Sequence, residues 1–213
     1  MDKLTSDIKR LRRKYEDVSK DFFIPEAAFF QLMTDERVKV AIAESGIQPH
    51  QQKEVADQVC LRGKKILGIL LLAKCTSLLQ HFIEADRLED AKLPFTQVTL
   101  MKKVRLSEEE ATDFDKEQWL FTAPTFQRGT INRRLDIGTV LPFKEDRKIG
   151  KGGFGDVYEV VLDPDHQLDN IFPQRVTDHL LSSLVLSLTI PSLLGRKFLR
   201  RTLINKSSKT WRF

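Results

Sequence analysis

The chain has 213 residues, of which 41% are hydrophobic and 31% charged, and this composition is typical of a soluble protein with one or two globular domains. Its net charge of +5 arises at the C-terminus, because seven of the 35 lysines and arginines follow Leu194 with no acidic residue among them, which leaves 28 against 30 acidic residues in the rest. The body of the chain therefore has no basic excess of the kind that nucleic-acid-binding proteins show, and we expect no nucleic-acid partner.

The N-terminus and the cysteines indicate the compartment. Segment 1–7 carries three charged residues, which argues against a secretory signal peptide. Cys60 and Cys75 are the only cysteines, they form no C-x-x-C motif, and with four scattered histidines they predict no metal site. We therefore expect a cytoplasmic or nuclear protein that is not secreted.

Apolar residues near the start of the chain follow a helical period. They are spaced by four and three residues, at Leu4, Ile8, Leu11, Tyr15 and Val18. This spacing predicts a helix over residues 2–20 with one apolar stripe and one basic face. The basic residues within 9–14 are typical of a solvated helix face, with a nuclear localisation signal as the alternative interpretation.

Two further helices follow. Pro25 is suited to open a helix over residues 26–33, because its fixed φ angle matches the first helical turn. Thr34 predicts an N-cap for a helix over 35–44, and the arginine three residues later makes this a plain cap without the reciprocal bond of a capping box. Ser45 and Gly46 indicate where that helix ends.

Residues 49–86 carry a broad apolar surface that predicts two or more packed helices. The run Ile66–Ala73 is strongly apolar but spans far less than the roughly 20 residues that a bilayer requires, so it predicts a buried helix. Gly63 and Gly68 indicate either a break or a close helix contact. His81 is interpreted as a packed or surface residue and not as a catalytic base.

The region from residue 87 changes character. Leu93–Phe95 and Val98–Leu100 predict an extended connector over residues 87–106. The sequence from Leu106 to Glu110 is a hydrophobic residue followed by a capping box, which predicts a helix that runs to about Trp119. Residues 1–125 are therefore expected to form a helical domain, and this domain can bind a protein partner.

A glycine-rich stretch occupies residues 149–158, with the sequence I-G-K-G-G-F-G-D-V-Y. Its glycines let backbone N–H groups approach a phosphate chain without a Cβ atom in the way. Phe154 can fold over the tip of such a loop, and Val157 stands where a strand side chain can cover a purine. The residues after Gly155 are β-branched and aromatic and lead into a turn at 163–167, so we expect an antiparallel hairpin over 144–163. An ordinary glycine-rich hairpin and a dinucleotide-binding loop, which would open a helix, are the alternatives.

This stretch resembles the glycine-rich loop of eukaryotic Ser/Thr protein kinases, which covers the ATP phosphates. The segments Leu93–Phe95, Gln118–Phe121 and Leu141–Phe143, together with the helical N-terminal region, are similar to a group of fungal protein kinases. The resemblance implies that residues 126–167 begin a kinase domain, that ATP is the nucleotide, with magnesium expected for the family, and that the family reaction is phosphoryl transfer to protein Ser or Thr. It implies nucleotide contacts from Ile149, Gly150, Lys151, Gly152, Gly153, Phe154, Gly155 and Val157.

The resemblance stops after the loop. The next lysine after Lys151 is Lys197, far beyond the position at which the family carries its phosphate-binding lysine. The chain contains no H-R-D-x-x-x-x-N motif and no D-F-G motif, so we assign no catalytic residue and no metal ligand. We therefore expect weak or lost ATP binding and an inactive, truncated kinase. The alternative is a non-catalytic helical interaction module that carries a vestigial kinase segment.

Residues 168–213 form a divergent basic tail, which we expect to be irregular or loosely helical. We interpret it as a departure from the family near Gln167, through a frameshift, intron read-through or a truncated gene. Residues 179–195 are uncharged and followed by Arg196 and Lys197, so a membrane anchor is the alternative, but the segment is short and contains several hydroxyl residues and a proline. The predicted fold class is thus mainly α, with a helical N-terminal domain followed by a partial kinase N-lobe hairpin.

Overall fold

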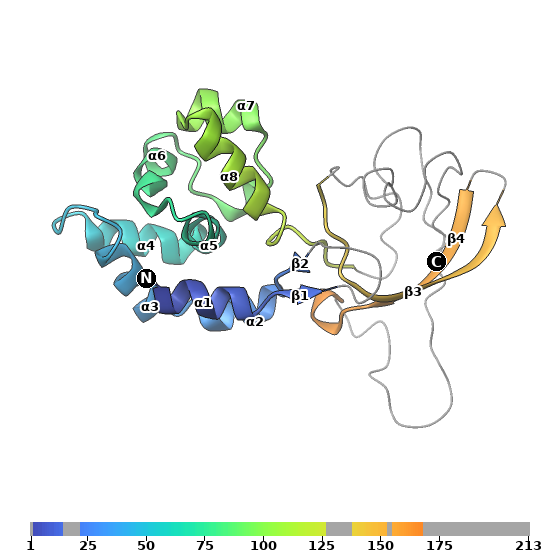
Figure 1. The fold of residues 1–213 in the computed structure, drawn as a ribbon. Helices are drawn as coiled ribbons and strands as arrows, with labels where there is room; N and C mark the ends of the chain where they lie inside the picture. The colour runs from blue at the N-terminus through green and yellow to red at the C-terminus, as the bar shows by residue number, and fades with distance from the viewer. Residues whose placement is uncertain (1, 15–21, 127–137, 153–154, 168–213) are drawn as a thin grey trace. The chain divides into compact units, whose positions relative to one another are not determined.

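The computed structural model describes residues 2–14, 22–126, 138–152 and 155–167, and the chain divides into two compact units (Figure 1). The first unit comprises the described residues up to Arg13 together with Ile24–Thr122. The second unit takes the described residues of Lys14–Phe23 and of the chain from Ala123 onward. The tail, predicted over 168–213, lies outside the described residues, as does the alternative anchor within it.

The first unit is mainly helical, which confirms the fold class predicted for it (Figure 1). Its α-helices are α1 (Asp2–Arg10), α2 (Glu26–Leu32), α3 (Asp35–Ala43), α4 (Gln52–Arg62), α5 (Lys64–Leu72), α6 (Leu79–Glu84), α7 (Gln97–Thr99) and α8 (Glu108–Gln118). Shorter turns complete it: the 3₁₀ turns η1 (Thr76–Leu78) and η2 (Asp90–Lys92), and the π-helical turn η3 (Leu100–Val104). The second unit contains β3 (Phe143–Gly152), β4 (Gly155–Leu162) and the 3₁₀ turn η4 (Pro164–His166). The short strands β1 (Arg13–Lys14) and β2 (Phe22–Phe23) pair with each other.

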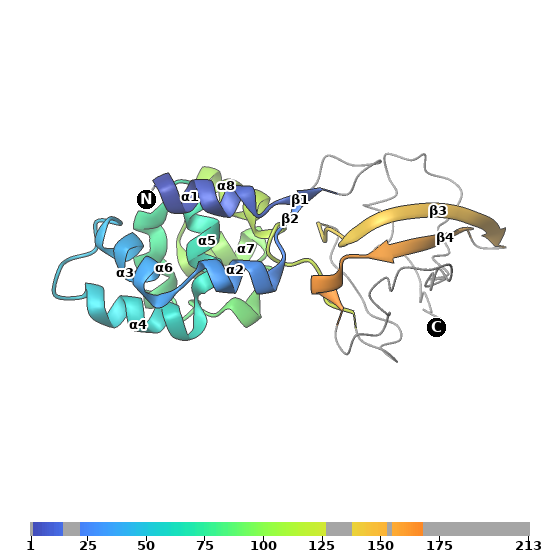
Figure 2. The ribbon, with the colours of Figure 1, turned by 90° about the horizontal axis from the view of Figure 1, so that it is seen from below.

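Helix α5 lies at the centre of the first unit. All its residues from Ile66 to Leu72 are buried, as expected for a helix that is apolar around its whole circumference. It packs against α1, α4 and α8, and Figure 2 shows α1 and α8 passing over one side of it. The prediction of a buried helix at Ile66–Ala73 is therefore confirmed.

Two glycines explain how closely the neighbours of α5 approach. A Cβ atom added to Gly68 would lie 2.9 Å from the Phe29 ring and 3.1 Å from the Phe121 ring, so only glycine leaves room for this pair of edge-packed rings. Gly63 separates α4 from α5, and a Cβ atom there would lie 2.6 Å from Leu88. Gly63 thus marks the break between two helices, and Gly68 allows a close contact with aromatic rings; both were alternatives in the sequence prediction.

The helix predicted over residues 2–20 is too long. Helix α1 ends at Arg10 and gives way to a turn and to strand β1, while residues 15–21 lie outside the described residues. The last turn tightens, because the amides of Leu11 and Arg12 bond to carbonyls three residues back. The guanidinium of Arg12 then reaches the carboxylate of Glu117 at 3.0 Å, so a tertiary contact overrides the apolar period.

The extended connector predicted over 87–106 is also wrong, because this region contains η2, α7 and η3. The Thr96 hydroxyl accepts a hydrogen bond from the amide of Thr99 and so provides an N-cap that the sequence interpretation overlooked. Leu100 and Val104, four residues apart, are buried and hold the turn against the core. Arg105 has a φ of 63° and ends it.

The predicted caps of α3 and α8 are confirmed. The Thr34 hydroxyl accepts from the amide of Arg37, with no reciprocal bond. At α8 the Ser107 hydroxyl accepts from the amide of Glu110, and the Glu110 carboxylate accepts from the amide of Ser107, which completes the capping box. Helix α8 ends with Trp119 as its C-cap, as predicted.

A buried amide joins two segments that are distant in sequence. The side chain of Gln118 accepts from the amide of Phe95 at 2.8 Å and donates to the carbonyl of the same residue at 2.9 Å. It also donates to the carboxylate of Asp115 at 2.6 Å. The ring of Phe95 packs with those of Phe82 and Phe114. These bonds join two of the segments that resemble fungal kinases, Leu93–Phe95 and Gln118–Phe121, inside the core.

We expect Gln118→Ala to destabilise the protein by about 2–4 kcal/mol, because it leaves a buried N–H and a buried carbonyl of Phe95 without partners. Urea unfolding followed by far-UV circular dichroism measures this. Gln118→Glu should not recover the loss, because a buried carboxylate cannot donate to the Phe95 carbonyl and would lie against the carboxylate of Asp115. Gln58→Ala, which removes a long surface bond to Glu54, is the control and should cost less than about 0.5 kcal/mol. Equal effects of the Gln118→Ala and Gln58→Ala substitutions would contradict this account.

Candidate functional site

The glycine-rich stretch lies at one end of an antiparallel hairpin formed by β3 and β4. Lys151 pairs with Asp156, and Gly152 pairs with Gly155, next to the two residues 153–154 that lie outside the described residues. After Gly155 the chain continues as a strand to Leu162, whereas a dinucleotide-binding loop would lead into a helix. The backbone therefore has the hairpin arrangement expected from the sequence.

The structure places the predicted nucleotide-binding residues on both strands of this hairpin. Four of them lie in β3, namely Ile149, Gly150, Lys151 and Gly152. Gly155 and Val157 lie in β4, and Val157 is the register partner of Gly150. Gly153 and Phe154 lie outside the described residues. The described members of the set are thus brought together within a few register positions.

The register of the hairpin is irregular beside the glycines. Lys148 pairs with Tyr158 and Gly150 pairs with Val157, so Ile149 is an extra residue in β3. Such a bulge bends the strand and increases its local twist. The sequence interpretation did not predict it, although an isolated glycine within a strand pattern is one of the signals for a bulge. This bulge separates the pairs at residues 145–148 from the glycine-rich end of the hairpin, and a second register shift lies between Phe143 and Glu145.

The turn that follows β4 is anchored within the second unit. Asp163 caps η4 by accepting from the amide of Asp165 at 3.0 Å. His166 is buried, its Nδ1 atom lies 3.2 Å from the carbonyl of Pro124, and its own carbonyl accepts from the amide of Phe126. The sequence predicted the turn but missed His166 as its anchor. The D-P-D-H sequence, a cap followed by a proline at the first helical position, is the signal that could have located it.

The described residues offer no metal centre, since no group of three or more His, Cys, Asp or Glu side chains among them could hold an ion. The two thiols are also poor nucleophiles. Burial raises the pKa of Cys75 to about 11, with a further contribution from Glu110 and Asp113. Burial and a hydrogen bond with Asp35 raise the pKa of Cys60. Both side chains therefore stay protonated at neutral pH and fill space in the structure.

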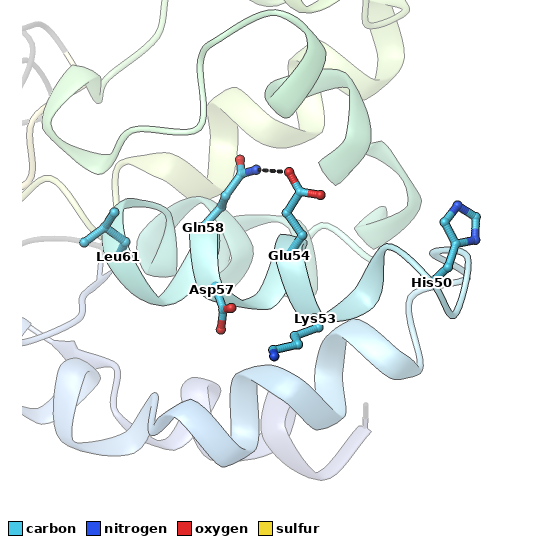
Figure 3. Close-up of a pocket in the computed structure, with 6 residues that line it drawn as sticks. All are labelled: His50, Lys53, Glu54, Asp57, Gln58 and Leu61. Atoms are coloured by element: carbon cyan, nitrogen blue, oxygen red, sulfur yellow. Dashed lines mark hydrogen bonds between the residues drawn. The ribbon is translucent and has the colours of Figure 1, made fainter.

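A hollow of about 570 Å³ lies along α4 and is lined by His50, Lys53, Glu54, Asp57, Gln58 and Leu61 (Figure 3). It is wide open, and its lining comes from α4 and from His50, two residues before that helix, so these residues provide no opposing wall. Figure 3 shows Glu54 and Gln58 bonded to each other while Asp57 and Lys53 point to the other side. Because no polar groups converge, this hollow is a helix surface and not a binding site.

Asp90 is the described carboxyl group with the most strongly raised pKa. Gly63, the N-cap of α5, has no side chain, and Asp90 supplies the missing cap by accepting from the amides of Lys65 at 2.8 Å and Ile66 at 3.0 Å. Burial raises the pKa of Asp90 to about 6, against the opposite influence of these two bonds and of the Lys65 charge. Its partners are backbone amides, so Asp90 is a capping residue. A glycine at the N-cap position was the sequence signal that a remote group had to complete the helix.

Comparison of this chain with protein-family models, with curated proteins and with solved structures found no match. Within the described ranges, none of the helices has the length and apolar character needed to cross a membrane.

The raised pKa of Asp90 predicts how stability depends on pH. In the unfolded chain this carboxyl titrates near its ordinary value of about 3.9, so the folded protein binds more protons between pH 4 and pH 6. The contribution of Asp90 to stability is therefore greatest below about pH 4 and decreases by up to about 3 kcal/mol as the pH rises through 6. We expect Asp90→Asn, which cannot titrate, to become more stable relative to the native chain over this interval.

Chemical denaturation at a series of pH values tests this. Asp86→Asn is the control, because Asp86 is exposed and only four residues away, and its difference from the native chain should change less over this interval than that of Asp90→Asn. If the native chain instead gained stability relative to Asp90→Asn as the pH rose, capping by the ionised carboxylate would outweigh the cost of its burial.

Proposed function

We propose that this chain is a protein-kinase-family protein whose glycine-rich hairpin contacts the phosphates of ATP weakly and which transfers no phosphate. The observation that carries the proposal is the sequence of residues 149–158 in an antiparallel hairpin, with Gly152 paired to Gly155 at its end. An extended glycine-rich backbone can offer N–H donors to a phosphate chain where side chains would otherwise stand in the way. A cytoplasmic or nuclear location belongs to the same proposal.

The inactivity rests on the groups that phosphoryl transfer requires. This reaction depends almost entirely on positioning and on stabilisation of negative charge. In the 213 residues, no lysine stands at the position where the kinase family carries its phosphate-binding lysine. Neither a catalytic-loop aspartate nor a magnesium-binding D-F-G aspartate follows the loop. Lys151 lies within the loop itself, and a lysine there does not replace one that is paired with a glutamate in the site. Magnesium would reach this chain with the nucleotide and not through protein ligands.

We expect ATP to bind with a dissociation constant on the order of 1 mM or weaker, because one wall of a site provides only a few hydrogen bonds. Incubation of the purified chain with labelled ATP, magnesium and a generic protein substrate should give no incorporation above that of a Gly152→Asp, Gly155→Asp variant. Phosphate transfer above this control would show that the chain is active.

A titration with labelled ATP separates a nucleotide-binding loop from an ordinary glycine-rich hairpin. The two aspartates place negative charge and side chains at the paired positions 152 and 155, so weak ATP binding should disappear in this variant. Gln48→Asp, an exposed substitution in the helical unit, adds one negative charge elsewhere and should leave binding unchanged. Equal ATP binding by the native chain and both variants would favour the ordinary hairpin.

A second function is supported by the helical unit, which we propose is a protein-interaction module. The specific observation is that Val98 and Met101 are exposed side by side on a helical segment next to lysines that make no ion pair among the described residues. Residues 1–125 contain the whole first unit, so we expect this fragment to fold on its own and to keep the helical far-UV circular dichroism spectrum. A random-coil spectrum would contradict both its independence and its proposed role.

A further inference from the structure

One surface of the helical unit combines exposed apolar groups with a cluster of exposed basic side chains. We call it the 98–105 surface; it consists of Val98, Met101, Lys102, Lys103 and Arg105. Val98 lies in α7, Met101, Lys102 and Lys103 lie in the π-helical turn η3, and Arg105 is the left-handed residue that ends it. Val98 is 62% exposed and Met101 41% exposed, and the three basic side chains are exposed as well. Figure 1 shows α7, where the segment begins, beside α8 within this unit.

The segment is held firmly from its inner side. Leu100 and Val104 are 0% and 1% exposed, and the Thr96 hydroxyl caps its start. The amide of Leu106 bonds to the carbonyl of Leu100 after the left-handed residue Arg105, which closes its end. A ligand that binds the outer side would therefore meet a preorganised surface and would not have to order it, which lowers the cost of binding.

The basic side chains of this surface are not engaged in ion pairs within the part of the unit that the structure describes. Residues 91–107 contain four basic residues and no acidic residue. Among the described residues, Lys102, Lys103 and Arg105 make no ion pair, whereas Lys64 and Lys65 are paired with Asp35 and Glu26. Three free cations beside two exposed apolar side chains form a surface that is complementary to alternating carboxylates and apolar groups.

We propose that the 98–105 surface binds a short acidic amphipathic helix from a partner protein, with apolar side chains over Val98 and Met101 and carboxylates facing the three cations. The proposal rests on the second proposed function, that the helical unit is an interaction module, and is independent of nucleotide binding. The segment from Val98 to Arg105 is eight residues long and helical over most of its length, so about two turns of a partner helix cover it.

The chemistry of the surface favours a peptide over a nucleic acid or a lipid bilayer. It contains no aromatic side chain on which a base could stack. Glu108 and Glu109 follow immediately in α8 and are exposed, so an extended polyanion that continued past Arg105 would meet negative charge. A short peptide ends before it reaches these carboxylates. The adjacent acids thus limit the length of the anionic ligand.

The test uses the full chain and a fluorescein-labelled helical peptide of about 14 residues, made of leucine, glutamate and alanine with leucines spaced by three and four. Fluorescence anisotropy should show saturable binding with a dissociation constant on the order of 10–100 μM. Binding should weaken at least tenfold in Lys102→Glu, Lys103→Glu and in Val98→Ser, Met101→Ser, and it should weaken as salt is added.

The matched control is Lys39→Glu, Val40→Ser on α3. Val40 is 57% exposed and follows an exposed lysine, so the control makes one change of each kind on another exposed helix, and affinity for the peptide should not change. Far-UV circular dichroism shows whether each variant is folded. A peptide in which lysine replaces every glutamate should not bind.

Each contrary result has a distinct meaning. If the acidic peptide shows no saturable binding up to about 1 mM, or if the control variant loses as much affinity as the 98–105 variants, the proposal is overturned. If vesicles containing phosphatidylserine or a single-stranded oligonucleotide bind instead of the peptide, the surface recognises a different polyanion. If the peptide binds but the 98–105 variants bind it equally well, the interaction module stands and this surface is not its site. ATP titrations of the same variants remain a separate test of the glycine-rich hairpin.

Discussion

The helical unit depends on the burial of α5. A helix with apolar side chains around its whole circumference is stable only if other elements cover every side of it, and α1, α4 and α8 do so together with η1, η2 and the rings of Phe29 and Phe121. Burying one leucine or isoleucine side chain contributes about 1.5–3 kcal/mol, so the run from Ile66 to Leu72 outweighs any single surface interaction in the unit. The same requirement explains Gly68, because the rings of Phe29 and Phe121 cover α5 at the point where it has no side chain.

Burial of this helix leaves backbone amides at its N-terminus that need hydrogen-bond acceptors from other parts of the chain. The first amides of α5 cannot be satisfied by their own N-cap, since Gly63 has no side chain and Leu88 occupies the space where one would lie. Asp90, two residues after Leu88, satisfies them instead, so one short segment both closes the N-terminus of α5 and caps it. The Gln118 side chain likewise bonds to the buried amide and carbonyl of Phe95. Buried amides and carbonyls without such partners would cost about 1–3 kcal/mol each.

Local signals predicted the parts of the fold that depend on nearby residues. The caps at Thr34 and Ser107, the break at Gly63 and the buried character of Ile66–Ala73 were all found as expected. The errors concern residues whose structure is decided by remote contacts. The helix from residue 2 stops early where Arg12 turns toward Glu117, and the supposed connector is helical because Leu100 and Val104 pack into the core. The hairpin was predictable from its β-branched residues and glycines, whereas the bulge at Ile149 depends on register, which pairing with β4 determines.

Because of the hydrogen bonds between Gln118 and Phe95, position 95 should tolerate substitution better than position 118. Gln118 contributes a side chain, and both of its bonds to residue 95 are made with backbone atoms that every residue except proline possesses. Position 95 is therefore constrained by the packing of its ring against Phe82 and Phe114, and another large apolar residue there would keep the hydrogen bonds. Position 118 has no such freedom, because only glutamine combines a donor and an acceptor at this distance from the backbone. Natural or laboratory drift in this protein should accordingly alter the residue at 95 more readily than its distant partner.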